Sequence, residues 1–238
     1  MEEPRVAPPP RPVGECRWNF PDPLTADPSG IVAFGADLMP ETLVHAYRAG
    51  IFPWPHPGAP LPWFSPDPRG VLLPDRLHVS RSLRQRLRRC GWTTTVDADF
   101  GAVVAACAVR PGGETWIDRD MVPAYHRLHQ LGWAHSLEVW DGAELVGGLY
   151  GVRVGGCFTG ESMFHRRTDA SKVALVDLID RWSGAGGELV DVQIATDHLV
   201  SLGVVEVARR QFLERLAVLR DRVTSMPVDR RSVSRLAR

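Results

Sequence analysis

The sequence predicts an α+β protein, and three observations support this fold class. Three strand-like segments, 134–141, 144–154 and 156–164, are joined by the short turns "DGAE" and "GG", which is typical of an antiparallel meander. Helix-like segments precede and follow this meander, and another apolar strand comes after the last long one. With 238 residues, 44% of them hydrophobic, the chain is long enough for a small domain followed by a larger one.

The small N-terminal domain is expected over residues 15–68, after a proline-rich tail (1–14) predicted to be disordered. It begins with a short strand (31–34) and a helix over 39–49, which has Pro40 in its first turn and ends before Gly50. The segment "GIFPWPHPGAPLPWFSPDPRGVL" (50–72) follows. Its prolines predict a stiff loop that is neither a helix interior nor a central strand.

The larger domain is expected over residues 69–222, with a flexible basic tail at 223–238. Besides the meander, it contains predicted helices at 99–109, 120–131, 170–183 and 210–220, and a buried strand at 189–194. A helix is also predicted within "HVSRSLRQRLRRC" (78–90), with Leu83 and Leu87 packed inward. Its arginines form either a solvated face or a phosphate-binding patch, and the run alone does not decide between these two interpretations.

Several function classes are disfavoured by what the sequence lacks. The four cysteines form no CxxC pair, so neither a zinc site nor a redox motif is indicated. No glycine-rich nucleotide loop and no run of 18 apolar residues is present. The acidic, proline-rich start differs from a signal peptide, and the formal net charge is zero. We therefore expect a cytoplasmic protein with no cofactor, no metal, no membrane partner and no DNA partner.

Polar side chains interrupt two of the apolar strands. Glu161 lies in "GCFTGESMF", where a buried carboxylate is costly unless it is paired or used. Asp191 and Gln193 are two residues apart in "LVDVQI", so on a strand they share one face. This face meets a cleft if the pair is catalytic. Alternatively, Asp191 pairs with an arginine and Gln193 bonds to backbone, and the spacing leaves both interpretations open.

Tryptophans in predicted loops indicate a nucleic-acid ligand when they are taken together with the arginine run. Trp54 lies in the proline-rich segment, and Trp116 follows the turn "RPGGE". Aromatic faces on loops stack on unpaired bases, and arginines bind phosphates. The two features together predict binding of the single-stranded end of an RNA.

A series of motifs then resembles one family across residues 19–214. The motifs "GIFPW", "WFSPDPRGVL", "LHVSRSL", "AYHRLHQLGWAHSLEVW", "LVGGLYGV", "GESMF", "ASKVAL" and "LVDVQ" are similar, in this order, to those of leucyl/phenylalanyl-tRNA–protein transferases. The resemblance implies transfer of leucine or phenylalanine from Leu-tRNA or Phe-tRNA to proteins that begin with Arg or Lys, which marks them for degradation. It also implies a larger domain related to the N-acetyltransferase (GNAT) fold.

The resemblance also implies site residues by position. Asp191 and Gln193 match the catalytic pair, Glu161 matches an acid near the acceptor, and Trp54 and Trp116 match the pair that holds the terminal adenosine. Other positions match the aminoacyl pocket (Leu149, Phe158 and Leu175), the acceptor side (Tyr47 and Tyr125) and a tRNA-binding basic patch (Arg81, Arg84, Arg88 and Arg89). The chain departs from the family at Trp63-Phe64, Val192 and Thr196, where two tryptophans, a cysteine and an asparagine are common.

The implied chemistry turns an ester into an amide and therefore needs no ATP. We expect Gln193 to bond to the incoming amine and Asp191 to orient it, with the proton passing to Asp191 or to the 3′-terminal hydroxyl of the tRNA. Glu161 is expected to attract the cationic side chain of the acceptor. Two alternative classes remain: a CoA-dependent N-acyltransferase and a non-catalytic protein that binds RNA 3′ ends.

Overall fold

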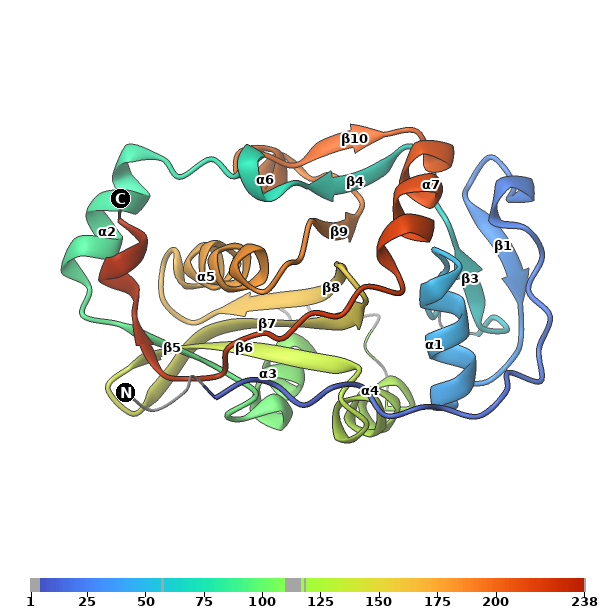
Figure 1. Cartoon of the computed structure of the whole chain (residues 1–238), viewed down its shortest axis with the longest axis horizontal. Helices are drawn as coiled ribbons and strands as arrows, with labels where there is room; N and C mark the ends of the chain where they lie inside the picture. The colour runs from blue at the N-terminus through green and yellow to red at the C-terminus, as the bar shows by residue number, and fades with distance from the viewer. Residues whose placement is uncertain (1–4, 57, 110–116, 118, 238) are drawn as a thin grey trace.

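A three-stranded sheet forms the smaller part of the molecule. The computed structural model describes residues 5–56, 58–109, 117 and 119–237 (Figure 1). The antiparallel strands have the order β1-β3-β2, with β1 at Ile31–Phe34, β2 at Phe52–Pro53 and β3 at Pro62–Phe64. Helix α1 (Pro40–Arg48) connects β1 to β2. Gly50 ends this turn with φ +77°, and a Cβ atom there would lie 2.4 Å from Leu213, so the tight junction requires glycine.

An eight-stranded sheet forms the larger part, in the order β10-β4-β9-β8-β7-β6-β5-β11. Among the described strands, β8 and β9 pair in parallel, and the other pairs are antiparallel. The predicted meander and the α+β class are therefore confirmed. The strands are β4 (Arg69–Leu72), β5 (Thr93–Val96), β6 (Ala134–Asp141), β7 (Glu144–Val154), β8 (Cys157–His165), β9 (Leu189–Gln193), β10 (Val205–Val207) and β11 (Arg231–Ser232).

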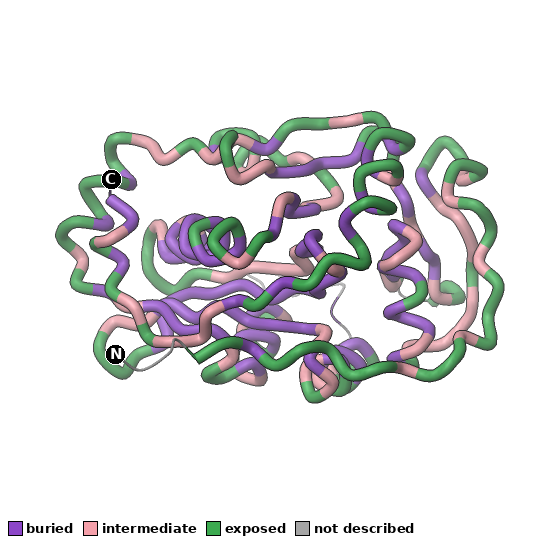
Figure 2. Tube along the Cα trace, in the orientation of Figure 1, coloured by how far each residue is buried: buried purple, intermediate pink, exposed green. Residues whose placement is uncertain are grey.

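Helices cover both faces of this sheet. At neighbouring glycines of β7, a Cβ on Gly147 would meet Ala170 of α5, whereas one on Gly148 would approach Val103 of α3. Helix α5 is buried over most of its length (Figure 2). The described helices are α2 (Arg81–Arg89), α3 (Phe100–Cys107), α4 (Met121–Gln130), α5 (Ala170–Gly184), α6 (Asp197–Val200) and α7 (Arg209–Leu219), besides α1 and three short 3-10 turns at 23–25, 74–76 and 233–236. None of the described helices is both long and apolar enough to cross a membrane.

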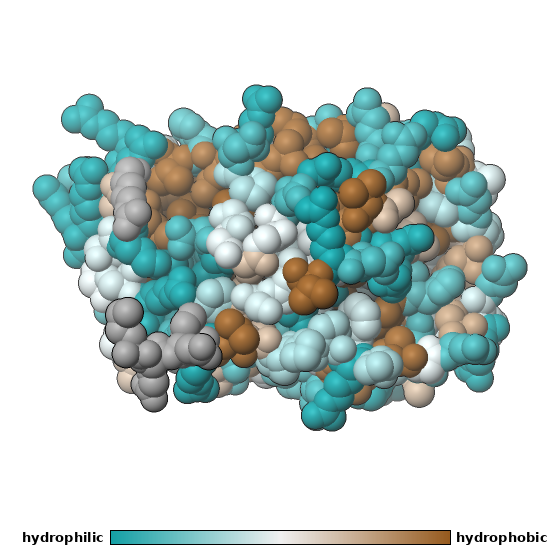
Figure 3. Space-filling model, viewed as in Figure 1, coloured by the Kyte–Doolittle hydropathy of each residue, from teal (hydrophilic) through white to brown (hydrophobic). Residues whose placement is uncertain are grey.

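Helix α2 has the predicted amphipathic character. Ser80 caps it by accepting the N–H of Leu83 at 3.2 Å. Leu83 and Leu87 are buried, whereas the side chains at the other positions of the helix are exposed. Figure 3 shows hydrophilic residues over this end of the molecule, and apolar residues along the edge where α6 and β10 lie.

The proline-rich segment contradicts one expectation, because it contains central strands. Strand β3 lies in the middle of the small sheet, and β4 lies between β9 and β10 in the large one. Pro53 ends β2, Pro62 begins β3, and Pro68 directly precedes β4. Prolines at the ends of strands of two to four residues remove few ladder hydrogen bonds, so the short strands tolerate them.

The described residues of both tails, for which disorder was expected, contact distant parts of the chain. Ala7 is 2% exposed and donates its N–H to the Met226 carbonyl at 2.8 Å. Strand β11 adds to the edge of the large sheet beside β5, and Val233 is fully buried. Arg235 forms an ion pair with the buried Asp177 of α5. Composition misses this because each tail is stabilised by a few apolar and charged residues that contact distant parts of the chain.

Candidate functional site

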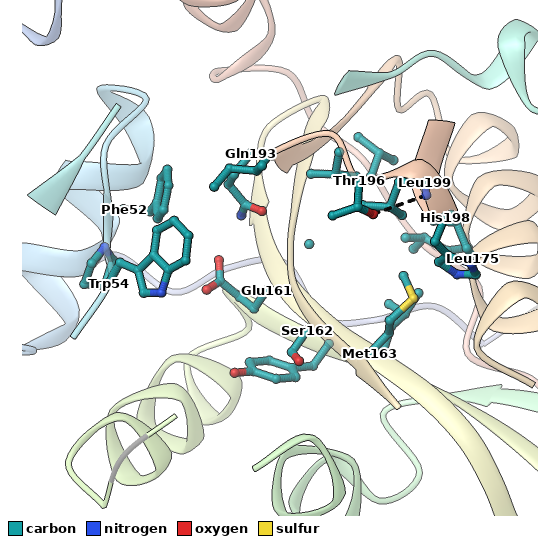
Figure 4. Close-up of a pocket in the computed structure, with 18 residues that line it drawn as sticks. Phe52, Trp54, Glu161, Ser162, Met163, Leu175, Gln193, Thr196, His198 and Leu199 are labelled. Carbon is teal, nitrogen blue, oxygen red and sulfur yellow. Dashed lines mark hydrogen bonds between the residues drawn. The ribbon is translucent and has the colours of Figure 1, made fainter. Parts of the chain in front are cut away.

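A cavity of about 320 Å³ lies between β2 of the small sheet and the β8–β9 region of the large sheet (Figure 4). Its lining includes the apolar side chains of Leu149, Met163, Leu175, Leu178, Val192 and Leu199, and Thr196 and His198 lie beside Leu199 and Leu175. Trp54, Glu161 and Gln193 lie near one another at the other side, as Figure 4 shows. The cavity therefore offers an apolar pocket beside an aromatic ring, a carboxyl group and a carboxamide, a combination typical of a small-molecule binding site.

Glu161 is held by two tyrosine hydroxyls. Tyr47 of α1 donates to Oε1 at 2.8 Å, and Tyr125 of α4 donates to Oε2 at 2.7 Å. The two tyrosine oxygens are themselves 2.6 Å apart. When Glu161 is ionised, these three contacts contain only the two hydroxyl protons, so a third proton would complete the ring of hydrogen bonds.

The protonation of this cluster follows from its burial. Burial raises the pKa of Glu161 to about 7, although the two hydroxyl donors partly oppose this shift. Burial and the Glu161 charge raise the pKa values of Tyr47 and Tyr125 well above the usual range, so both hydroxyls keep their protons at neutral pH. Glu161 can therefore both release and accept a proton near neutrality.

The predicted pair Asp191 and Gln193 separates into a buried residue and a cavity residue. Gln193 lines the cavity, and its backbone has the left-handed φ of +62°. Asp191 is 1% exposed and does not line the cavity. Its carboxylate forms a bidentate ion pair with Arg69 at 2.7 and 2.8 Å and accepts the Gln193 N–H at 3.0 Å. Of the two interpretations that the spacing left open, pairing with an arginine is the one observed for Asp191.

The remaining predicted site residues differ in whether they line the cavity. Trp54, Leu149 and Leu175 line the cavity. Phe158 does not: it is 1% exposed, and its ring packs at 5.8 Å from that of Trp182, so the expectation that it lines the pocket is corrected. Trp116 lies outside the described residues.

The basic patch is separate from the cavity lining. Arg81, Arg84, Arg88 and Arg89 are exposed on α2. Neighbouring Arg86 lies 3.7 Å from Asp169 at the start of α5. Among the described residues, no three His, Cys, Asp or Glu side chains are grouped so that they could hold a metal ion.

Sequence reasoning missed several residues of the site. Arg69 was part of the motif "SPDPR" but carried no predicted role. Its importance follows only from its contact with Asp191, which is distant in the sequence. Phe52 was not among the predicted site residues, yet it is buried, at 6% exposure, and lines the cavity beside Trp54. Met163 was also missed: the pairing of β8 with β7 shifts between Gly160 and Ser162, and four consecutive residues from Gly160 to Met163 line the cavity, which simple strand alternation does not predict.

An α+β fold with an apolar pocket beside a titratable carboxyl group and a carboxamide is suited to a transferase that holds an acyl group for attack. The leucyl/phenylalanyl-tRNA protein transferase model matches residues 71–217, and the model of that family's N-terminal domain matches residues 36–67. The chain belongs to the leucyl/phenylalanyl-tRNA protein transferase family.

Named relatives agree over most of the chain. A leucyl/phenylalanyl-tRNA–protein transferase of Citrobacter koseri is 50% identical over 203 residues, which cover 84% of this chain and 87% of the relative. One from an Anaeromyxobacter species is 51% identical over 209 residues, which cover 87% and 89%. The solved structure of L-PGS from Bacillus licheniformis is similar with a TM-score of 0.38 and 13% identity, covering 70% of this chain and 58% of that one.

Proposed function

We propose that this protein transfers leucine or phenylalanine from Leu-tRNA or Phe-tRNA to the α-amine of proteins that begin with Arg or Lys. The new N-terminal residue would mark the acceptor for degradation in the cytoplasm, where aminoacyl-tRNA is made. The observation that carries the proposal is the 50–51% identity to relatives named for this transfer, along nearly the whole chain. The cavity supports it, because it combines a largely apolar lining with Glu161 and Gln193, which lie near each other.

The reaction exchanges one acyl bond for another. The acceptor's neutral amine attacks the ester carbonyl, and a C–N bond forms while the bond from that carbon to the 3′ oxygen of the tRNA breaks. The amine loses a proton, and the departing 3′ oxygen gains one. Because an ester is converted to an amide, the chain needs mainly to bring the reactants together and to manage these protons.

Glu161 is suited to accept the proton of the amine. With a pKa of about 7 it is partly ionised at neutral pH, close to the amine pKa of roughly 8. The Tyr47 and Tyr125 hydroxyls hold its carboxyl group at the cavity edge. Asp191 is less suited, since Arg69 and the Gln193 N–H occupy its oxygens inside the protein. In this proposal Gln193 orients the amine by hydrogen bonding, and the negative charge of Glu161 favours a cationic acceptor.

The inner pocket would hold the leucine or phenylalanine side chain. Leu149, Met163 and Leu175 supply apolar atoms there, and Thr196 and His198 are polar neighbours, so a charged aminoacyl group would exchange much of its hydration for apolar contacts. A flexible methionine side chain can adapt to an aliphatic or an aromatic group. Discrimination between similar apolar groups by such a pocket is limited to about 1–3 kcal/mol.

The tRNA is proposed to approach with its terminal adenine against Trp54, with Trp116 as the second wall. Trp54 lines the cavity next to Phe52, and its ring lies 6.3 Å from that of Phe52. Base–aromatic stacking contributes about 1–3 kcal/mol per base. The exposed arginines of α2 would bind phosphates elsewhere on the tRNA.

The larger sheet is proposed to be related to the GNAT fold. Its support is the antiparallel run β6–β8, followed by α5 and by β9, which pairs in parallel with β8. A strand-by-strand superposition of an experimental structure on solved N-acetyltransferases would test this relation.

The activity test uses labelled leucine on Leu-tRNA and peptides that begin with Arg, Lys or Ala, without ATP. Transfer to the Arg and Lys peptides but not to the Ala peptide is expected. Binding of Leu-tRNA without transfer would instead indicate an RNA 3′-end-binding protein. Acyl transfer from acetyl-CoA would indicate the CoA-dependent alternative. Either of these two outcomes would overturn the proposed function.

A further inference from the structure

The buried guanidinium of Arg69 lies behind two walls of the cavity, one formed by Phe52 and Trp54 and the other by Gln193. Arg69 begins β4 and is 1% exposed. Its Nε and Nη2 atoms donate to the two carboxylate oxygens of Asp191, and Nη1 donates to the Gly50 carbonyl at 3.2 Å. Gly50 ends the turn between α1 and β2, whereas Asp191 belongs to β9. The side chain therefore links the small sheet to the large one.

Arg69 also supports the aromatic wall of the cavity. Its guanidinium carbon lies 4.9 Å from the ring centre of Phe52 and 4.4 Å from that of Phe212. A planar guanidinium stacks on aromatic faces and bonds a carboxylate bidentately, which a lysine ammonium cannot do. Phe52 in turn lines the cavity beside Trp54. The place of this wall thus depends on Arg69.

The carboxamide wall depends on the same guanidinium through Asp191. Gln193 has a left-handed backbone, which is unfavourable for a residue with a side chain. Its N–H is bonded to the Asp191 oxygen that also accepts from Arg69 Nε, and the next N–H, of Ile194, bonds to the Val192 carbonyl at 2.7 Å. A carboxylate held from two sides can keep the Gln193 backbone in this conformation.

We propose that Arg69 is a positioning residue that sets the place of the Gln193 carboxamide relative to the Trp54 wall. Arg69 acts through Asp191 on one side and through Phe52 and Gly50 on the other. Asp191 then serves as a hydrogen-bond acceptor inside the protein and does not take a proton from substrate. The kinetic part of this inference rests on the proposed function, but its structural part does not.

The test compares Arg69→Lys with Arg181→Lys. Arg181 is an equally buried control, because it is 1% exposed and donates to Asp177 at 2.8 Å, away from the cavity lining. For Arg69→Lys we expect kcat to fall on the order of 30- to 100-fold, the size of effect caused by misplacing a reacting group by about 1 Å. KM for Leu-tRNA should change by less than about threefold, because the pocket and Trp54 remain. Arg181→Lys should change neither constant by more than about twofold once folded protein is counted.

A second measurement follows the backbone directly and requires no catalysis. The amide proton signal of Gln193, assigned by NMR in the whole protein, should move in Arg69→Lys and in Asp191→Asn but stay in place in Arg181→Lys. If Arg69→Lys does not fold, Asp191→Asn tests the same hydrogen bond.

The outcomes separate this inference from the proposed function. A wild-type protein without transfer activity would overturn the proposed function, and the NMR comparison would still decide the positioning role. Active wild type with equal kcat values for the two lysine variants, or an unmoved Gln193 signal in the Arg69 and Asp191 variants, would overturn the inference.

Discussion

Each half of the large sheet lies beside a buried Arg–Asp ion pair and a glutamate, but the surroundings of these groups differ. Near β8 and β9, Glu161 borders the cavity, and the buried Arg69–Asp191 pair lies behind its lining and bonds to the backbone of Gln193, which does line it. Near β5 and β6, another buried ion pair, Arg181–Asp177, and the buried Glu138 bond to other parts of the protein. Each pair is a guanidinium with a carboxylate, and each glutamate accepts two side-chain hydroxyls.

The difference lies in what surrounds each glutamate. Glu138 accepts Thr95 and Ser136 hydroxyls at 2.5 Å and lies near the N–H groups of Ala98 and Asp99, at 3.3 and 3.5 Å. Glu138 belongs to β6, is fully buried and accepts hydrogen bonds from the turn that leads into α3. Glu161 has tyrosine donors but borders an open cavity. Residue type and hydroxyl donors therefore do not distinguish the two acids, whereas exposure does: Glu138 is enclosed in protein, and Glu161 is only partly buried and borders the cavity.

The largest expected difference is in turnover. Glu161→Gln removes the proposed proton acceptor and should lower kcat by about 10²- to 10⁴-fold, the usual contribution of general base catalysis. Glu138→Gln is the matched control and should leave kcat of the folded protein within about twofold, since no substrate reaches it. Single-turnover transfer from Leu-tRNA to an Arg-peptide measures both. Equal losses in the two variants would break the comparison.

The next largest effect is on folding, and here the two ion pairs should behave alike. Asp177→Ala and Asp191→Ala each leave a buried guanidinium without its carboxylate, which typically costs about 3–5 kcal/mol. Urea unfolding measures the loss. The pairs should differ only in activity: in the fraction that stays folded, Asp191→Ala should lower kcat and Asp177→Ala should not. A small stability loss in both would show that neither pair is needed for the fold.

A smaller effect concerns the pH dependence of stability. In the folded protein the pKa of Glu161 is raised from 4.5 to about 7, so wild type binds more protons than the unfolded chain between these values. Stability contributed by the neutral acid is therefore present at pH 4 and is lost as pH rises through 7. The free energy of unfolding of Glu161→Gln minus that of wild type should therefore be larger at pH 8 than at pH 4, by up to about 3 kcal/mol.

Unfolding curves of both proteins across this pH range check the sign. Burial also raises the pKa of Glu138. Glu138→Gln should therefore also reduce the loss of stability that occurs as pH rises. If the stability of Glu161→Gln relative to wild type decreased as pH rises, the raised pKa of Glu161 would be contradicted.

The smallest expected effect is on tRNA binding by the exposed arginines of α2, which lie away from the cavity lining. Arg81→Ala and Arg84→Ala on α2 should each weaken binding of tRNA by about threefold and reduce the salt dependence of binding by about one charge. Stability should change by less than about 0.5 kcal/mol, because both side chains are exposed. Filter binding at several salt concentrations tests this, with Arg210→Ala on α7 as an exposed control. An equal loss in the control would indicate a diffuse charge effect.

Much of the fold follows from local pattern. The turns within the meander and the inward Leu83 and Leu87 are each decided by neighbours in the chain, and the structure agrees with each. Contacts between distant residues could not be predicted in this way. In the C-terminal segment, Met226 is 1% exposed and Arg235 pairs with Asp177.

For this protein, the sequence by itself determined the α+β class, the family and the unusual position of Glu161 and Gln193 on apolar strands. Periodicity and short motifs carry these properties, because they depend on residues a few positions apart. Only the tertiary structure decided that Asp191 is bound by Arg69, 122 residues away, and that Tyr47 meets Glu161 across 114 residues. Such pairs form when sheets and helices pack, and packing leaves the partly buried Glu161 at a cavity and encloses Glu138 in protein.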